Sequence, residues 1–504
     1  MLSKNKKFYI TTSIVYTNAS PHIGFALESI QADVIARYQQ ISGKEVFFLT
    51  GTDEHGAKVA KAAEEEKKES KEFADKISRK VRSFKKILNL SNDDFIRTTD
   101  QKRHWPTVKK VWLKLKENGD IYKKQYKGLY CPGCETFITK KDLKDKKCII
   151  HKKKPEIIEE ENYFFRLSKY SKKIEKIIAE DKIHIIPKTR KKEILNFVQH
   201  GLEDISFSRP RKDLKWGIPV PDDKSHTIYV WSDALVNYIS ALSYSKNSKK
   251  FQKFWPADVH CIGKDILKFH GAIWPGMLLS LGLPLPKTIF VHGFITVDGQ
   301  KMSKSLGNII NPFELVRKYG TDSVRYFLLR EIPSTEDGDF TYRKFEQRYN
   351  ADLASGLGNL VARILTLAER LAIKQYLPAS GLSRRRWQAD NHKAIEPEID
   401  KVWRDYKKAL DEFKFNKALA AIWKLISFCD KYIEKEKLWK QTKNQQSKIN
   451  NLLFALAHIA HLLKPFLPET SEKILKQLGI KLIEKKPWKF KIKKRKSLFP
   501  RFNS

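Results

Sequence analysis

With 504 residues, of which 41% are hydrophobic and 12% aromatic, the chain is long enough for about two to four globular domains with buried cores. The 98 Lys and Arg residues exceed the 58 Asp and Glu residues by 40, and this positive charge favours a polyanionic partner such as RNA. The sequence has no uninterrupted apolar stretch of about 18 residues and no secretion signal, and its number of cysteines is odd. These observations predict a cytoplasmic protein with no membrane partner.

The amino-terminal part predicts the beginning of a doubly wound α/β sheet. Residues 7–16 have the apolar character of a buried strand, and after a turn residues 23–41 carry apolar side chains at helical spacing. A second strand at 46–50 leads into the polar segment 51–56. Strand, tight turn and helix with an early glycine are typical of a nucleotide-binding βα unit. Because ligands gather where such strands end, we expect a ligand site there.

Three of the five cysteines lie close together in the sequence with a histidine beside them. Cys131 and Cys134 form a CxxC pair, and Cys148 and His151 form a CxxH pair. This spacing lets each pair bind one side of a tetrahedral zinc ion. A closed set of three thiolates and one imidazole leaves no position for water, so we expect one structural zinc ion and no catalytic role for it.

After this insertion the sheet is expected to resume, with strands at 227–231, 258–261 and 288–291. The last strand leads into a loop of small and polar residues that contains Lys301 and Lys304. Paired ammonium groups on a mobile loop suit a polyphosphate whose negative charge grows during a reaction.

Beyond residue 345 the apolar spacing is almost entirely helical, which predicts a carboxyl-terminal helix bundle. The expected helices are 345–374, 396–413, 415–438, 447–463 and 468–478.

The motifs, in their order and spacing, resemble those of the methionyl-tRNA synthetases, a family of class I aminoacyl-tRNA synthetases. The matching segments are TGTDEHG (50–56), the CxxC and CxxH knuckle (131–151), YVWSDAL (229–235), FVHGFITVDGQ (290–300) and KMSKS (301–305). The resemblance implies an α/β fold, a class I Rossmann-type doubly wound parallel sheet with a zinc-containing insertion, followed by an all-α anticodon-binding helix bundle. The implied domains are 1–117 (Rossmann domain, first half), 118–225 (connective insertion), 226–325 (Rossmann domain, second half), 326–355 (stem-contact link) and 356–504 (anticodon-binding bundle).

The resemblance also implies the reaction. Such an enzyme activates methionine with ATP and Mg to methionyl-adenylate, releases pyrophosphate, and transfers methionine to the 3′ end of its tRNA. The implied partners are methionine, ATP, and initiator and elongator methionine tRNA. Because the chain ends near the end of the family's catalytic core, we expect a monomer.

Site residues can be carried over from the family motifs position by position. The implied methionine site is Ile14, Tyr16, Asp53, Trp231, Tyr238 and His292. The implied ATP site is His22, Gly24, Lys264, Asp265, Lys301, Ser303 and Lys304, of which His22, Gly24, Lys301 and Lys304 take part in catalysis. The implied anticodon contacts are Asn359, Arg363 and Trp439.

Two positions depart from the family pattern. The family has His-x-Gly-His at the first nucleotide motif, whereas this chain has Phe25 in place of the second histidine, so one donor to the ATP phosphates is missing. Leu438 stands where the family commonly has a proline before the anticodon tryptophan. The alternative from another class is therefore a synthetase-derived tRNA-binding protein whose activation step is impaired by Phe25. A synthetase for another aliphatic or thiol amino acid is disfavoured by the closed knuckle and by the chain length.

Overall fold

The computed structural model describes residues 7–133, 135–138, 142–149, 152–303, 306–371, 395–440, 444–480, 490–493 and 497–502. None of the helices in these ranges is long and apolar enough to span a membrane. The chain divides into two compact units, each of which is described separately below. The first unit comprises Met1–Ala32, Gln39–Lys86 and Leu90–His292, and the second comprises Asp33–Tyr38, Ile87–Asn89 and Gly293–Ser504.

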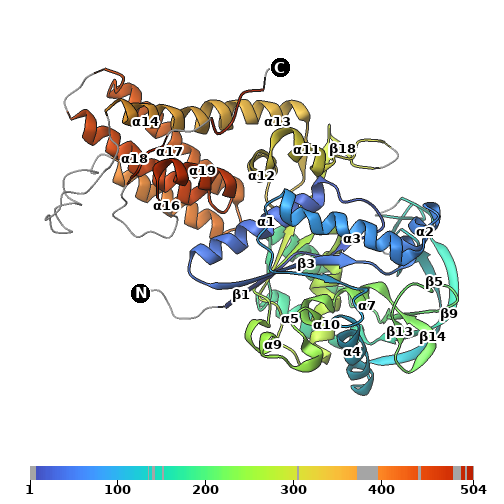
Figure 1. Ribbon diagram of the computed structural model, residues 1–504. Helices are drawn as coiled ribbons and strands as arrows, with labels where there is room; N and C mark the ends of the chain where they lie inside the picture. The colour runs from blue at the N-terminus through green and yellow to red at the C-terminus, as the bar shows by residue number, and fades with distance from the viewer. Residues whose placement is uncertain are drawn as a thin grey trace. The chain divides into compact units, whose positions relative to one another are not determined.

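A parallel sheet forms the centre of the first unit (Figure 1). Its inner strands are almost entirely buried, as expected for strands covered on both faces. The non-sequential strand order is that of a doubly wound fold, as predicted. From one edge to the other, the described strands are β10 (His184–Ile186), β16 (Thr288–His292), β15 (Val259–Gly263), β1 (Lys7–Thr11) and β3 (Glu45–Asp53), with β2 (Val15–Tyr16) and β4 (Asp94–Arg97) both bonded to β3.

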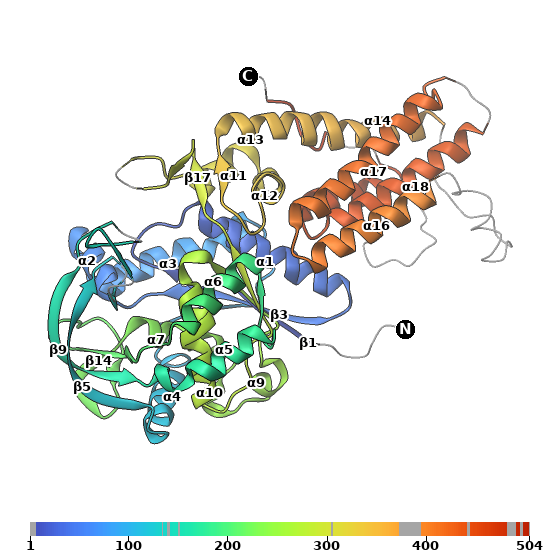
Figure 2. The same ribbon diagram turned by 180° about the vertical axis from the view of Figure 1, so that it is seen from behind.

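Helices cover both faces of this sheet (Figures 1 and 2). On one face, α3 buries the apolar stripe of Phe73, Ile77 and Val81 in a small core with Val15 and Phe95. A larger core on the other face includes residues of α4, α5, α6 and α10. The helices of the first unit are α2 (Ala57–Glu65), α3 (Ser70–Ile87), α4 (Trp105–Glu117), α5 (Ser171–Ala179), α6 (Lys188–Gln199), α7 (Val230–Ala234), α8 (Asn237–Ser240), α9 (Lys249–Phe254) and α10 (Trp274–Ser280), while α1 (Ile23–Ile41) contributes residues to both units.

The insertion carries an antiparallel sheet of its own, which the sequence did not predict. Its two long strands, β5 (Ile121–Cys131) and β9 (Glu156–Phe165), pair antiparallel (Figure 1). The sheet order is β11 (Ile205–Ser206), β9, β5 and β6 (Thr136–Ile138), and β7 (Leu143–Lys144) pairs with β8 (Lys147–Cys148). A further sheet consists of β12 (Ser208–Pro210), β14 (Asp223–Ile228) and β13 (Pro219–Val220).

The prediction that the parallel sheet resumes with a strand at 227–231 is wrong, because β14 pairs antiparallel with β12 and β13 in a separate sheet and includes only Thr227 and Ile228 of that range. Strand β14 ends at Ile228, and Trp231 lies in the short helix α7. The apolar and aromatic run TIYVW favours a strand by composition, but a helix of five residues is too short to reveal its spacing.

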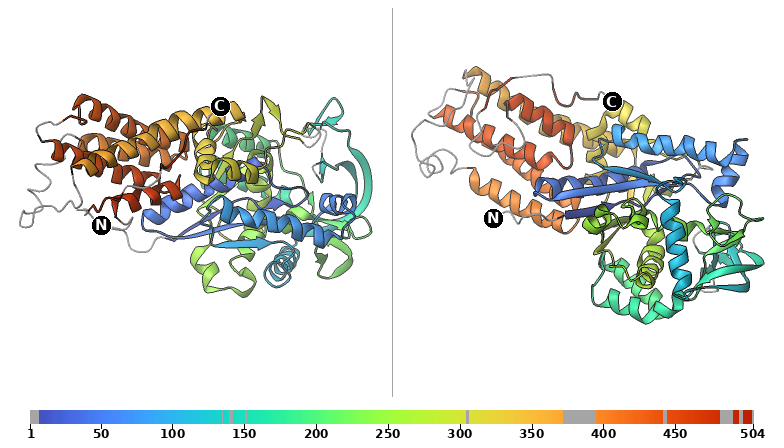
Figure 3. Two further views of the ribbon diagram at one scale, coloured as in Figure 1. Left: turned by 45° about the horizontal axis from the view of Figure 1, so that its top comes forward. Right: turned by 60° about the horizontal axis from the view of Figure 1, so that its bottom comes forward.

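The second unit is mainly helical, as predicted. It begins with β17 (Ile295–Val297), which pairs with β18 (Gln300–Lys301) and with β19 (Gly338–Phe340). Figure 3 shows its carboxyl-terminal helices packed side by side as a bundle. The described helices are α11 (Pro312–Tyr319), α12 (Thr321–Arg330), α13 (Tyr342–Arg348), the π-helical η6 (Tyr349–Gly358), α14 (Asn359–Arg370), α16 (Glu396–Asp411), α17 (Phe415–Lys435), α18 (Gln445–Leu463) and α19 (Pro468–Leu478).

A buried arginine joins distant segments of this second unit. The guanidinium group of Arg325 on α12 forms an ion pair of 2.7 Å with Asp33, and both side chains are fully buried. It also donates to the carbonyl oxygens of Phe466 at 2.7 Å, Pro465 at 2.8 Å and Leu88 at 3.0 Å. The planar guanidinium group can donate to all these acceptors at once. The ion pair and hydrogen bonds therefore offset the free-energy cost of burying its charge.

Candidate active site

Strand register brings several of the predicted site residues to one edge of the parallel sheet. Tyr16 on β2 lies opposite Asp53 on β3, and Gly263 on β15 lies opposite His292 on β16. The 3-10 turn η4 (Lys264–Ile266), which contains Lys264 and Asp265, follows Gly263 directly. All these residues therefore lie at or just beyond the carboxyl ends of parallel strands, where ligands bind in such sheets.

Asp53 has the properties of a cation-binding carboxylate. Its side chain is buried, and no described residue donates a hydrogen bond to its Oδ1. Burial raises the pKa of Asp53 well above its ordinary value, and the nearby carboxylates of Asp233, Glu135 and Glu54 raise it further. A buried carboxylate oxygen without a partner is costly, so a bound ammonium group would be strongly favoured here.

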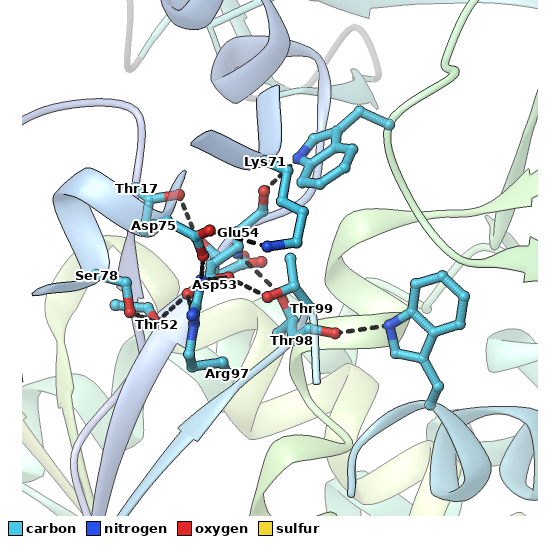
Figure 4. Close-up of polar contacts among 12 residues, drawn as sticks. Thr17, Thr52, Asp53, Glu54, Lys71, Asp75, Ser78, Arg97, Thr98 and Thr99 are labelled. Atoms are coloured by element: carbon cyan, nitrogen blue, oxygen red, sulfur yellow. Dashed lines mark hydrogen bonds and ion pairs between the residues drawn. The ribbon is translucent and has the colours of Figure 1, made fainter. Parts of the chain in front are cut away.

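The neighbouring carboxylate, Glu54, is already satisfied by the protein (Figure 4). Its Oε1 accepts from Arg97 Nε at 2.7 Å and from the Thr52 hydroxyl at 2.6 Å. Its Oε2 accepts from Arg97 Nη2 at 2.8 Å and from the Thr99 hydroxyl. Two adjacent acidic residues of one motif thus differ in their contacts, because Glu54 joins β3 to β4 whereas Asp53 Oδ1 has no donor among the described residues.

Aromatic side chains of the YVWSDAL segment pack beside this edge. Trp231 stacks on Phe269 with ring centroids 3.6 Å apart and 14° between the planes. Its indole N–H is buried and finds no acceptor within the described part of the chain. Tyr238 is buried, and its hydroxyl lies 2.7 Å from His270 Nε2. Ile14 packs against the hydrophobic core that contains Tyr238.

The proton positions in this aromatic group follow from one carbonyl contact. His270 Nδ1 lies 3.1 Å from the carbonyl oxygen of Ile266, so Nδ1 carries the proton. Burial lowers the pKa of His270 to about 4, so the ring is neutral and its Nε2 accepts a hydrogen bond from Tyr238. Neither Phe269 nor His270 was predicted as a site residue.

His292 is oriented by a carboxylate that the sequence analysis missed. Its Nε2 lies 2.9 Å from Glu28 Oε2, and both side chains are buried. The other oxygen of Glu28 accepts from the backbone N–H of Ser13 at 2.6 Å and from its hydroxyl at 2.7 Å. The available signal was a single charged residue in the buried and otherwise uncharged amino-terminal half of α1.

His22 and Gly24 form a compact turn at the beginning of α1. The backbone N–H of Gly24 donates to His22 Nδ1 at 3.1 Å, and a side chain at Gly24 would come within 2.8 Å of the imidazole. Burial lowers the pKa of His22 to about 4, so the ring is neutral and Nε2 carries its proton. The ring of Phe25 packs on His22 with centroids 4.5 Å apart.

The predicted phosphate loop belongs to the second unit. Lys301 ends β18, and Ser303 follows it. Asn308 closes the loop, because its Oδ1 accepts from the Ser303 N–H at 2.9 Å and its amide donates to the Lys301 carbonyl oxygen at 3.3 Å. Lys304 lies outside the described residues.

Comparison with known proteins places this geometry in a family. Residues 8–142 and 135–365 match the tRNA synthetases class I (M), and residues 392–499 match the anticodon-binding domain of tRNA ligase. The methionine–tRNA ligase of Thermotoga maritima is 44% identical over 496 residues, covering 96% of this chain and 76% of the relative. The chain belongs to the methionyl-tRNA synthetase family. The methionine–tRNA ligase of Bacillus subtilis is 40% identical, covering 100% of this chain and 79% of the relative.

Solved structures of methionyl-tRNA synthetases agree with this assignment. The Mycobacterium tuberculosis methionyl-tRNA synthetase in complex with methionyl-adenylate is 36% identical, with a TM-score of 0.90 over 98% of this chain and 100% of that chain. The apo form has a TM-score of 0.84 at 33% identity, over 99% of each chain. The predicted class I α/β fold with a carboxyl-terminal helical domain is confirmed, and the comparisons give no support to the alternative of a non-catalytic tRNA-binding protein.

Two of the four predicted zinc ligands lie among the described residues. Cys131 ends β5 and Cys148 ends β8, and both side chains are buried in one small cluster with Ile138. Cys134 and His151 lie outside the described residues. For this reason the described residues alone do not contain a cluster of three or more metal-binding side chains.

The predicted anticodon residues lie on the helical bundle of the second unit. Asn359 begins α14, and Arg363 on the same helix pairs with Asp430 at 3.2 Å and with Glu434, both on α17. Trp439 follows the end of α17 and is 46% exposed, whereas Leu438 beside it is fully buried. Leu438 thus anchors the segment that presents the tryptophan.

Proposed function

We propose that the chain is an ATP-dependent methionine–tRNA ligase whose amino-acid site lies around Asp53. It activates methionine with ATP to methionyl-adenylate, releases pyrophosphate, and transfers methionine to the 3′ end of its tRNA. The single observation that carries the assignment of the site is the buried Asp53 oxygen without a described donor, at the carboxyl edge of the sheet and opposite Tyr16.

In this proposal the methionine site is formed by Asp53 and by apolar and aromatic walls. Asp53 binds the substrate ammonium group by a charge-assisted hydrogen bond. The thioether lies among polarizable rings, where each sulfur–aromatic contact contributes about 0.3–1.5 kcal/mol. The walls are Ile14, Tyr16, Trp231, Tyr238 and His292, with Phe269, His270 and Glu28 supporting them.

His22 is the proposed donor to the triphosphate. Because Nδ1 accepts from Gly24, the proton on Nε2 is available for a phosphate oxygen as charge develops on it. Lys264 and Asp265 would contact the nucleotide, and Lys301, Ser303 and Lys304 would bind the departing pyrophosphate. Mg²⁺ would enter with ATP and neutralise part of the phosphate charge.

A structural zinc ion fits the residues of the insertion. Cys131 and Cys148 come from different strands and are both buried in the same cluster, as two ligands of one closed site would be. With Cys134 and His151 they would bind one zinc ion, which would stabilise the fold of the insertion and would not take part in the reaction.

The bundle is the proposed anticodon-binding region, through Asn359, Arg363 and Trp439. Four further features remain predictions. They are initiator and elongator methionine tRNA as substrates, a monomeric state, a cytoplasmic location, and the domain boundaries 1–117, 118–225, 226–325, 326–355 and 356–504. The exposed ring of Trp439 beside a buried anchor supports its role as a stacking platform for an unpaired base.

The experiment that tests this function is amino-acid-dependent exchange of pyrophosphate into ATP by the purified chain. We expect exchange with methionine and not with leucine, isoleucine, valine or cysteine. Asp53→Asn should raise the KM for methionine, because truncating one partner of a buried charge pair costs about 2–5 kcal/mol. The absence of methionine-dependent exchange by a folded protein would overturn the proposal.

A further inference from the structure

A carboxylate at the tip of the insertion contacts the proposed methionine site from outside the sheet. Glu135 follows β5 by four positions, yet its side chain is buried and reaches residues far away in the sequence. Its Oε2 accepts a hydrogen bond from the hydroxyl of Tyr16 at 2.7 Å, across 119 positions. Its Oε1 accepts from the backbone N–H of Lys58 at 2.7 Å, across 77 positions. One side chain therefore joins the insertion to two elements of the central fold.

The contact with Lys58 is an ordinary and favourable helix cap. Helix α2 begins at Ala57, so the N–H of Lys58 is one of the donors that the helix itself leaves without a partner. A carboxylate at this end of a helix is stabilised by these N–H groups and by the helix dipole. The side-chain ammonium of Lys58 also donates to the carbonyl oxygen of Gly133, which ties the same loop to α2 a second time.

The backbone indicates that this arrangement is held in place by its contacts. Glu135 has a φ of 48°, in the left-handed region that residues other than glycine rarely adopt. Such a conformation persists where the surroundings fix it. Gly56, at the beginning of α2, has a φ of 106°, and a Cβ there would lie 2.5 Å from the Tyr16 hydroxyl and 3.3 Å from Glu135 Oε1. The absence of a side chain at Gly56 lets these two groups meet.

We propose that Glu135 is a positioning residue for the amino-acid site, because it fixes the ring of Tyr16 beside Asp53. This inference rests on the proposed function. Tyr16 lies opposite Asp53 in the strand register, so the orientation of its ring defines one wall of the space in front of the Asp53 carboxylate. The hydroxyl of Tyr16 is committed to Glu135, and its ring therefore serves as a fixed wall and not as a donor to the substrate. The tip of the insertion thereby shapes the methionine site.

The test compares Glu135→Ala, Tyr16→Phe and the double variant in methionine-dependent pyrophosphate exchange. Each single variant should raise the KM for methionine about 10-fold to 100-fold, the range for losing a hydrogen bond to a charged group, without changing the KM for ATP. The double variant should be no worse than the more affected single variant, because both changes remove the same contact. Glu135→Gln, which keeps an acceptor oxygen for Tyr16, should recover part of the loss.

Glu159→Ala is the matched control, since Glu159 is an exposed glutamate of the same insertion that pairs only with the exposed Lys127 among the contacts described. It should leave both KM values unchanged. The zinc content of every variant is measured, and Tyr16→Phe tests the same contact without altering the insertion. The inference would be overturned if Tyr16→Phe and Glu135→Ala left the KM for methionine unchanged, or if their effects were additive in the double variant. In either case, exchange by the wild-type chain would still support the proposed function. No exchange by the wild-type chain would overturn the function and the inference with it.

Discussion

His22 is fixed as a neutral hydrogen-bond donor by its immediate surroundings. The Gly24 N–H occupies Nδ1, and burial lowers the pKa of the ring to about 4, so its charge does not change near neutral pH. Beside it, Phe25 offers an apolar ring to the small core that contains Val15 and Phe73. The first nucleotide motif of this chain therefore has one donor and one packing residue where the family has two donors.

From this we predict that Phe25→His accelerates methionine activation. A second donor to the phosphates should raise the rate of pyrophosphate exchange, by up to about 10²–10³-fold if it is well placed. Phe25→Leu is the control, because it keeps an apolar side chain and adds no donor, and its rate should not rise. A folded Phe25→His variant with an unchanged or lower rate would show that another group already supplies the missing contact.

If Asp53 binds the substrate ammonium group as proposed, we predict that methionine binding depends on pH. Its pKa is raised above the ordinary carboxyl value, so it becomes protonated at a higher pH than an exposed aspartate. The substrate ammonium group favours the ionised form, and the affinity for methionine should therefore fall as the pH falls through the raised pKa. The measurement is the KM for methionine in pyrophosphate exchange from neutral to mildly acidic pH. In Asp53→Asn this dependence should disappear, and a pH-independent KM in the wild type would contradict the assignment.

At the scale of elements, Arg325 joins α12 to three other segments of the second unit. Arg325→Met would remove a fully buried ion pair and leave Asp33 with Arg37 as its described partner, at 2.7 Å. We expect a loss of about 3–5 kcal/mol in the stability of the second unit, because a buried carboxylate and several carbonyl oxygens lose a donor. The change is measured as a lower midpoint of thermal unfolding. Lys318→Met, which removes an exposed pair with Glu346, should have almost no effect, and equal shifts in both variants would refute this role.

Long periodic elements were predictable from the sequence, and short ones were not. The helix expected at 23–41 agrees with α1, and that at 468–478 agrees with α19, because each carries several turns of apolar spacing. The first two residues of the short helix α7, Val230 and Trp231, were predicted as the end of a strand, since so short an apolar and aromatic run shows no period. The antiparallel strands of the insertion were not predicted, because the spacing of the cysteines and the histidine indicates metal ligands and not the strands that carry them.

At the scale of the whole molecule, the contacts that complete the site are the least visible in the sequence. Glu28 and His292 are 264 positions apart, and Tyr16 and Glu135 are 119 apart. Neither pairing can be read from the sequence, because each contact is created only when distant elements pack together. The residues at strand ends, such as Asp53, could be predicted because parallel strands end at a common edge. The supporting residues behind them required the structure.

The division of the chain into two units leads to a last prediction, that tRNA recognition can be impaired without affecting activation. Asp53 and the methionine site belong to the first unit, and Trp439 belongs to the second. Trp439→Ala should weaken tRNA binding by about 1–3 kcal/mol, the contribution of one stacked base. It should therefore raise the KM for tRNA in charging and leave pyrophosphate exchange unchanged. Trp439→Phe is the matched control, since it keeps an aromatic ring on which a base can stack, and its KM for tRNA should change much less. If Trp439→Ala lowered charging and exchange equally, the tryptophan would be a structural residue and not a platform for the anticodon.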